Sequence, residues 1–415
     1  MEVLSKRASK ERRWRERAAR RQRNDYVIYA ESEQRRKQLA RDPNLTGRPQ
    51  PEEHADVRIG SYTEREVRSR AGWQDARFRR AISYRAGTQS TEPPQVSGRT
   101  MDDVLDKIGA KKVWPKYRGQ GVTIVVIDTG VNGDLPEFRT KRRDVRVTMP
   151  GGNHWIDPMG HGTMAAAIAC GVRGHGARYD GVAPDAELVP VRVPVDHRQS
   201  FDDVWLPYIY GDLLRLQRDK VISGRIVISH SIAVEGCEAT YADHERDGVV
   251  AAVRRCIDAG MVFVFAAGNN HIRCAHAATA DAPSTIWALS SYDPIISVGT
   301  VDWTDSNQTA GRDHASSSRG KGEWASATSK PDVVAPTYGD VRYGNDYSDR
   351  HWWGTSGAAA QVAGLAALML SKNPSLSPAD VQAIITANTT PLPKASRLCV
   401  GSGLINCEQA VARTP

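Results

Sequence analysis

The sequence predicts an α/β fold, a doubly wound, mostly parallel sheet with helices on both faces, preceded by a basic amino-terminal extension. After residue 100, short runs rich in Val and Ile recur, as in strands that are buried on both faces. Stretches with a helical pattern separate these runs, and such alternation favours a parallel sheet. The 415 residues are enough for two or three domains, or for one large α/β domain with appendages.

Residues 1–100 differ in composition from the rest of the chain. They hold 24 Lys and Arg against 14 Asp and Glu, out of 56 and 48 in the whole chain, so the net positive charge belongs to them. The sequence predicts a charged helix over residues 5–41, interrupted by a candidate strand at Tyr26–Tyr29, then a break rich in proline up to Pro51. A second charged stretch covers Tyr62–Arg85, and Thr88–Arg99 is typical of a linker.

Two interpretations of residues 1–100 remain open. They form either a small prosegment-like or regulatory domain, or a largely disordered basic arm with too few apolar residues to offset the entropy of ordering. Their charge fits a solvated helix surface, and the competing interpretation is binding to an acidic partner or to nucleic acid.

Residues 101–415 are predicted to form the sheet domain. The predicted strands are Val122–Ile127, Leu188–Val193, Ile226–Ser229, Met261–Phe265, Ile295–Val298 and Val333–Ala335. The predicted helices are Thr163–Ala169, Val204–Arg218, Glu245–Ala259, Ser356–Ser371 and Ser377–Ala387. In such sheets, functional residues gather beyond the carboxyl ends of the strands.

Composition also bears on location and redox state. No run of 18 or more apolar residues occurs, so no membrane-spanning helix and no membrane partner are expected. The amino terminus lacks the apolar core of a signal peptide, which predicts a cytoplasmic protein. The six cysteines form no CxxC pair, and we expect reduced structural thiols, with Cys399 and Cys407 as the pair to bridge in an oxidising compartment.

Three residues in separate segments supply the groups for nucleophilic acyl transfer. Asp128 ends the first strand, His161 stands in Gly-His-Gly-Thr before a small-residue helix, and Ser356 opens the helix that begins near Gly354. Individually they have ordinary explanations, namely a turn cap, a structural histidine and a helix N-cap. Together they match a serine that needs an imidazole base, itself oriented by a carboxylate. Asn269, which follows the strand Met261–Phe265, is the candidate oxyanion donor beside the Ser356 backbone N–H.

These segments resemble the subtilisin-like serine proteases, the subtilases of peptidase family S8, over about residues 105–412. The matching motifs are VVIDTG around Asp128, GHGT around His161, GVAPDAELVPVRV from Gly181, AAGN ending at Asn269, KPDVVAP from Lys330, GTSGAAAQVAGLAALML from Gly354 and GSGLIN from Gly401. The order Asp, His, Ser is that of subtilisin. The resemblance implies a subtilisin fold and a serine endopeptidase that cleaves proteins or peptides through an acyl-enzyme.

The resemblance also implies a substrate that binds as an added strand. Ser231, Ile232 and Ala233 would pair with the substrate backbone, and Ala266, Ala267 and Gly268 would form the other wall of the pocket. The competing interpretation is that both segments are ordinary strand ends. As a family prosegment, residues 1–100 would block the cleft intramolecularly and be cut near residues 86–110, where Arg85 and Arg99 are close to candidate cut points.

Departures from the family pattern leave alternatives open. The chain has Met164 where a second histidine is common, and Ala360 where a proline usually follows the nucleophile by four residues. The second change favours an amine acceptor, so a peptide ligase or cyclase is an alternative, as is a catalytically silent binding protein of the same fold. Ala233 replaces a glycine, and the loop at residues 196–200 replaces a small-residue stretch, so we expect unusual specificity pockets.

No metal or other cofactor is predicted. The family often binds calcium through a loop after the histidine helix, but Gly171–Tyr179 is poor in the oxygen ligands that calcium needs, and Asp134 would be one remaining ligand. His271, Cys274 and His276 lie close in sequence without a fourth ligand, which favours a polar loop over a metal site.

Overall fold

The computed structural model describes residues 24–29, 57–62, 77–80, 82–85, 98–141, 144–147, 152–195, 200–237, 248–275, 284–307, 313–324, 330–348 and 352–415. The chain divides into two compact units. The first comprises Met1–Ile82 with Asp202–Gly211 and Glu245–Val253, and the second comprises the remaining residues.

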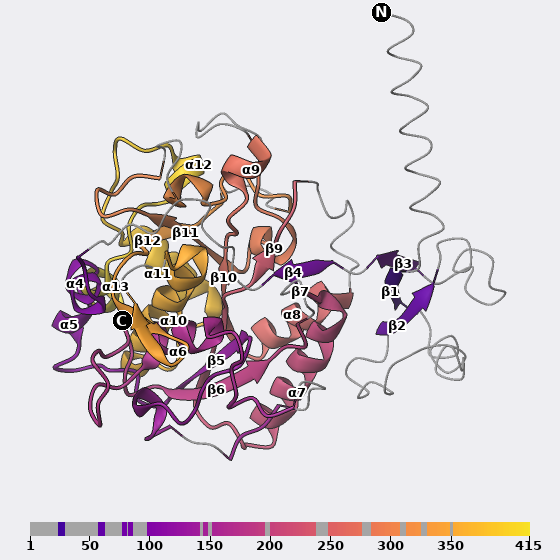
Figure 1. Cartoon of the computed structure of the whole chain (residues 1–415), viewed down its shortest axis with the longest axis horizontal. Helices are drawn as coiled ribbons and strands as arrows, with labels where there is room; N and C mark the ends of the chain where they lie inside the picture. Colours follow the sequence, from indigo (N-terminus) through magenta and orange to yellow (C-terminus); the bar gives the residue numbers. More distant parts are fainter. Residues whose placement is uncertain are drawn as a thin grey trace, which may run out of the picture. The chain divides into compact units, whose positions relative to one another are not determined.

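A parallel sheet is the centre of the second unit (Figure 1). Its strands, in spatial order, are β12 (Val333–Pro336), β11 (Ile296–Val301), β10 (Val262–Ala266), β8 (Arg225–His230), β5 (Val122–Asp128) and β6 (Glu187–Arg192). All six predicted strands are therefore confirmed. Every residue of β5 is buried, so both faces of the sheet are covered there, which explains its unbroken apolar run.

Two small-residue helices pack on each other and on this sheet. They are α6 (His161–Cys170), which is buried throughout, and α10 (Gly354–Lys372), which contacts β5, β8, β10 and β11. Glycine allows the close packing of α10 on α6, because a Cβ at Gly364 would lie 3.0 Å from the carbonyl oxygen of Ala169. Both helices were predicted, but each begins two residues earlier than expected, so His161 and Ser356 lie inside helical first turns.

The described part of the chain after residue 82 contains further helices and strands. The other helices are α4 (Met101–Lys107), α5 (Ala110–Val113), α7 (Leu206–Arg218), α8 (Gly248–Asp258), α9 (His271–Ala275), α11 (Pro378–Ala387), α12 (Arg397–Val400) and α13 (Cys407–Arg413). The 3-10 turns are Pro136–Phe138, Asp203–Trp205, Ala288–Ser291 and Asp313–Ser316. The other strands are β4 (Ser83–Arg85), β7 (Ser200–Asp202), β9 (Ala233–Val234), β13 (Val341–Tyr343) and β14 (Asp346–Ser348). The predicted helices that correspond to α7 and α11 are confirmed with small shifts at their starts. The one that corresponds to α8 is confirmed over Gly248–Asp258, and residues 245–247 lie outside the described residues.

The described part of the amino-terminal region contains an antiparallel sheet. Its strands are β1 (Asn24–Tyr29), β2 (Val57–Tyr62) and β3 (Arg77–Arg80), with β1 in the centre. The candidate strand at Tyr26–Tyr29 is thus confirmed as part of β1. Asn24 and Asp25, which were predicted as helix, also belong to this strand, because β1 pairs with β2 along its whole length. The remainder of the predicted charged helix over residues 5–41, and the linker up to residue 97, lie outside the described residues.

One cysteine prediction is wrong. Cys237 and Cys274 form a disulfide, whereas Cys399 and Cys407, the pair expected to bridge, are free and buried. The two bonded cysteines are 37 residues apart in sequence. They meet because each lies in the segment that follows one of two neighbouring strands, β8 and β10. Among the described residues, no helix is long and apolar enough to cross a membrane.

Candidate active site

The predicted catalytic residues lie at the carboxyl edge of the sheet or at helix starts beside it. Asp128 is the last residue of β5, His161 is the first of α6, Ser356 is the third of α10, and Asn269 follows β10 by three residues. The sheet therefore collects residues that are up to 228 positions apart in the sequence. This is the edge at which α/β folds of this type place their functional groups.

Asp128 and His161 form a buried hydrogen-bonded pair. The Nδ1 atom of His161 lies 2.7 Å from Oδ1 of Asp128, and the side chains are 6% and 0% exposed. The same oxygen accepts the backbone N–H of Thr129 at 2.7 Å. Gly162 permits this approach, since a Cβ there would lie 2.1 Å from the carbonyl oxygen of Gly130. Because the carboxylate accepts the Nδ1 proton, Nε2 is left as the basic nitrogen.

Two carboxylates control the protonation of His161. Burial disfavours the imidazolium and on its own would lower the pKa of His161, but the charge and hydrogen bond of Asp128 and the charge of Asp157 outweigh burial. The pKa of His161 is therefore raised above its ordinary value near 6.5. The arrangement stabilises the imidazolium that forms when the histidine takes a proton.

Asp157 was missed by sequence reasoning, although it precedes His161 by only four residues. Its carboxylate accepts hydrogen bonds of 2.7–3.0 Å from the Thr129 hydroxyl, the N–H groups of Met159 and Gly160, and the N–H and hydroxyl of Thr163. It thereby fixes the start of α6 and ties it to the end of β5. An acidic residue shortly before a helix that lacks a side-chain cap is the signal that could have revealed it.

Replacing Asp157 by asparagine should move the acid limb of the pH–rate profile to lower pH. The change removes a negative charge that raises the pKa of His161, so the imidazole stays neutral at more acidic pH. The measurement is kcat/KM for a peptide substrate between about pH 5 and pH 8, the range in which histidines titrate. Asp258→Asn is the matched control, because that exposed residue ends α8 just before β10, at the opposite edge of the sheet. A uniform loss of rate without a shift of the acid limb would reduce Asp157 to a structural role.

Ser356 contacts the segment that was predicted to bind substrate. Its hydroxyl donates a hydrogen bond to the carbonyl oxygen of Ser231 at 2.7 Å, and the Ser231 hydroxyl donates to the Ser356 carbonyl at 3.1 Å. No hydrogen bond joins Ser356 to His161, both of which are among the described residues. The hydroxyl must therefore rotate about its Cα–Cβ bond to reach Nε2 of the imidazole.

Asn269 faces the start of α10. Its Oδ1 accepts the N–H of Thr355 at 3.1 Å and the Thr355 hydroxyl at 3.0 Å. These bonds identify the oxygen end of the amide, so Nδ2 carries the donors. Gly354 leaves space for it, because its φ is +59° and a Cβ there would lie 3.0 Å from Nδ2. Residues in the first turn of a helix have backbone N–H groups without intrahelical partners, and Ser356 belongs to that turn.

The two predicted walls of the substrate pocket lie next to each other. Ser231 and Ile232 are buried and lead into β9, which begins at Ala233. Ala266 and Ala267 are buried too. Gly268 adopts a φ of +102°, and a Cβ at this position would lie only 3.7 Å from that of Ala233. The disulfide between Cys237 and Cys274 links the segments that follow the two walls.

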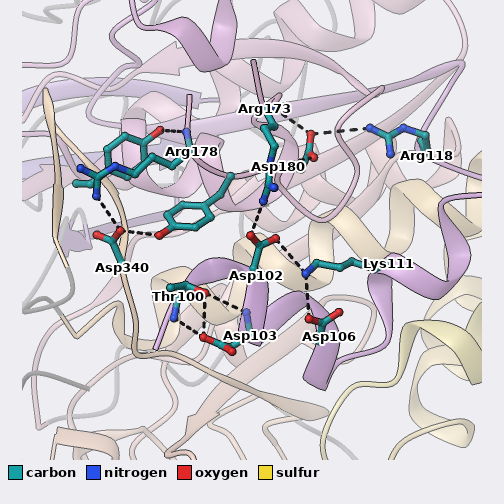
Figure 2. Close-up of polar contacts among 12 residues, drawn as sticks. Thr100, Asp102, Asp103, Asp106, Lys111, Arg118, Arg173, Arg178, Asp180 and Asp340 are labelled. Atoms are coloured by element: carbon teal, nitrogen blue, oxygen red, sulfur yellow. Dashed lines mark hydrogen bonds and ion pairs between the residues drawn. The ribbon is translucent and has the colours of Figure 1, made fainter. Parts of the chain in front are cut away.

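The loop at residues 171–180 is held by ion pairs (Figure 2). Arg173 pairs with Asp102 in α4, and its backbone N–H donates to Asp180 at 3.0 Å. Arg178 pairs with Asp340 at 3.1 Å, and that carboxylate also accepts the Tyr179 hydroxyl at 2.7 Å. Guanidinium groups thus supply the positive charge at this loop.

No cluster of three or more His, Cys, Asp or Glu side chains suited to a metal ion occurs among the described residues. Within the His271, Cys274 and His276 group, Cys274 is committed to the disulfide. The ring of His271 is buried and lies 3.3 Å from the Thr285 hydroxyl, while His276 falls outside the described residues.

Comparison with known proteins gives one consistent result. The Subtilase family (Peptidase_S8) matches residues 119–403. The serine protease AprX of Bacillus subtilis is 28% identical over 71% of this chain and 66% of its own length, and the subtilisin-like protease PopC of Myxococcus xanthus is 28% identical over 69% and 59%. The chain thus spans less than two thirds of the length of these relatives.

Solved structures share the fold at low sequence identity. The structure of fervidolysin from Fervidobacterium pennivorans, described as a keratinolytic enzyme related to subtilisin, has a TM-score of 0.68 at 17% identity and covers 95% of this chain and 61% of its own. That of MycP1 with its N-terminal propeptide removed has a TM-score of 0.55 at 24% identity, covering 74% and 96%. With the subtilisin fold, and with the family match over most of the chain, this protein belongs to the subtilases, the subtilisin-like serine proteases of peptidase family S8.

Proposed function

We propose that the chain is a serine endopeptidase that hydrolyses peptide bonds with Ser356 as nucleophile. The observation that carries this proposal is the buried 2.7 Å pair of His161 and Asp128, placed at the same sheet edge as the start of α10. The pair fixes the imidazole as a base through Nε2. The substrate is a protein or peptide that binds as an added strand along Ser231, Ile232 and Ala233.

The catalytic cycle follows from these groups. The Ser356 hydroxyl rotates from the Ser231 carbonyl to Nε2 of His161, loses its proton to the imidazole and attacks the peptide carbonyl carbon. Asp128 stabilises the imidazolium, while Nδ2 of Asn269 and the Ser356 N–H donate to the oxyanion. His161 then protonates the leaving amine, and a water molecule, deprotonated by His161, attacks the acyl-enzyme and releases the second product.

The alternatives lack specific support. Ala360, whose substitution for proline suggested a ligase or cyclase, is fully buried within α10. Among the described residues near Ser356, no group distinguishes a binding site for an amine from one for the hydrolytic water. A catalytically silent binding protein would not need the Asp128–His161 pair. Burying the carboxylate of this pair costs free energy of folding.

We further propose that the chain ahead of the sheet domain acts as an intramolecular prosegment. Two observations support this role. The region contains its own antiparallel sheet of β1, β2 and β3, and its last described strand, β4, pairs with β9, which includes Ala233, one of the residues assigned to substrate binding.

The endopeptidase proposal is tested with a denatured protein substrate and identification of new amino termini. The chain whose cleft is opened by Tyr84→Ala and Arg85→Ala should generate internal cleavages, and the same chain with Ser356→Ala added should generate none. Ser375→Ala is the matched control, since it makes the same chemical change at an exposed serine. Equal cleavage by the opened chains with and without Ser356→Ala would refute the proposal, and so would absence of cleavage by the folded opened chain that keeps Ser356.

We also propose that the loop at residues 171–180 is stabilised without calcium. EDTA should leave Tm unchanged, whereas salt near 1 M, where the Debye length is about 3 Å, should lower it by screening the exposed ion pairs. Arg173→Gln should cost about 1 kcal/mol or less of unfolding free energy, because its side chain is 47% exposed, and should reduce this salt response. The exposed Arg139→Gln serves as control. A Tm that falls in EDTA and recovers with calcium would contradict this account.

A further inference from the structure

A segment of the chain itself lies where an added substrate strand would bind. Strand β4 is the central strand of a three-stranded sheet in the order β7, β4, β9 (Figure 1). It pairs antiparallel with β9, with Tyr84 opposite Val234 and Arg85 opposite Ala233. Because Ala233 was assigned to substrate binding and Ser231 touches the nucleophile, β4 shows how the cleft receives side chains upstream of the scissile bond.

Tyr84 fills an aromatic pocket. Its side chain is fully buried, and its ring centroid lies 5.6 Å from that of Phe201 and 5.8 Å from that of His230, the latter edge-on. The His230 ring is stacked on Phe265 at 4.1 Å, which fixes the floor of the pocket. Burial lowers the pKa of His230 to about 4, so this floor is uncharged at neutral pH and suits an aromatic side chain.

Arg85 meets a carboxylate. Its guanidinium forms an ion pair with Glu235, which directly follows β9. The side chains of Arg85 and Glu235 are 38% and 17% exposed, so the carboxylate is the more enclosed of the two. Ser83, on the other side of Tyr84, is exposed. Two neighbouring side chains of β4 are thus recognised, Tyr84 by apolar contact and Arg85 by charge.

We propose that this cleft selects substrates with an aromatic residue followed by a basic residue, and that Glu235 and the pocket of Phe201 and His230 are its specificity determinants. This inference rests on the proposed peptidase function. In an antiparallel pair, the substrate residue opposite Ser231 comes two positions after the residue opposite Ala233. That residue lies next to the Ser356 hydroxyl, which donates a hydrogen bond to the Ser231 carbonyl. The recognised pattern is therefore aromatic, basic, any, any, with cleavage after the fourth residue. In the chain itself this count leads to the Gly87–Thr88 bond, which lies outside the described residues.

The test uses the full chain carrying Tyr84→Ala and Arg85→Ala, which should leave the cleft open, and compares it with wild type. The peptides are fluorogenic versions of residues 82–90, Ile-Ser-Tyr-Arg-Ala-Gly-Thr-Gln-Ser. Replacing Tyr by Ala in the peptide should lower kcat/KM by about 10- to 100-fold, through loss of one buried aromatic side chain. Replacing Arg by Glu should lower kcat/KM by about tenfold or more, because like charges then meet at Glu235.

Variants at Glu235 separate specific recognition from general loss of folding. Glu235→Gln should abolish the preference for Arg over Gln in the peptide, and Glu235→Lys should reverse it to Glu over Arg, while cleavage of a denatured protein persists. Ser83→Ala changes the exposed position of β4. It should leave β4 in the cleft, so activity should stay as low as in wild type. Equal cleavage of all peptides, with casein still degraded, would overturn the specificity proposal while leaving the peptidase proposal intact. Failure of the opened variant to degrade casein would overturn both.

Discussion

Ser356→Ala should lower kcat for peptide hydrolysis by about 10⁶-fold, the magnitude known for the corresponding serine in subtilisin, a relative of this chain. The substitution removes the oxygen atom that forms the acyl-enzyme, and water must then attack the peptide directly. The fold should tolerate it, because the loss is one hydroxyl and its hydrogen bond to Ser231. Circular dichroism and Tm establish folding, and Ser375→Ala controls for the chemical change. A loss smaller than about 100-fold would show that another group is the nucleophile.

Asp128→Asn should reduce kcat by about 10⁴-fold, the effect of the same substitution in a serine protease of another fold. The asparagine amide can donate to Nδ1 of His161, which then places the imidazole proton on Nε2, where a base is needed. Loss of the carboxylate also removes the largest influence that raises the pKa of His161. We therefore expect a lower plateau together with an acid limb displaced to lower pH. A loss below tenfold, with an unmoved acid limb, would contradict the assigned role.

The raised pKa of His161 also links pH to activity and stability. Catalysis needs the neutral imidazole, so wild-type activity should fall as pH drops through a pKa above 6.5. For stability the sign is opposite. Because the folded pKa exceeds the unfolded one, the contribution of the Asp128–His161 pair is fully present below the unfolded pKa and is lost as pH rises through the folded pKa.

The sheet and the four catalytic candidates were predictable because their signals are local. A strand buried on both faces reads as an apolar run, and Asp128 and Asn269 follow such runs directly. His161 and Ser356 stand in glycine-rich helix starts, where close packing excludes larger residues. Family motifs then indicated that these separate segments belong to one site.

What the sequence did not predict depends on contacts between distant segments. Strand β4 has three residues, too few for a pattern, and its partner β9 lies about 150 positions away. The disulfide likewise requires knowledge that β8 and β10 are neighbours. The cytoplasmic location expected from the amino terminus stays a prediction. Asp157 was overlooked because its role depends on the loop that wraps its carboxylate.

The central claim is that Ser356 is an activated nucleophile, and mapping a fluorophosphonate adduct tests it most directly. Wild type and the variant with Tyr84→Ala and Arg85→Ala are labelled while folded, digested and sequenced by mass spectrometry. We predict one adduct, on Ser356, that forms faster in the variant because its cleft is open, and none in Ser356→Ala or after denaturation. An adduct on another serine, or no adduct on the folded opened variant, would contradict the account.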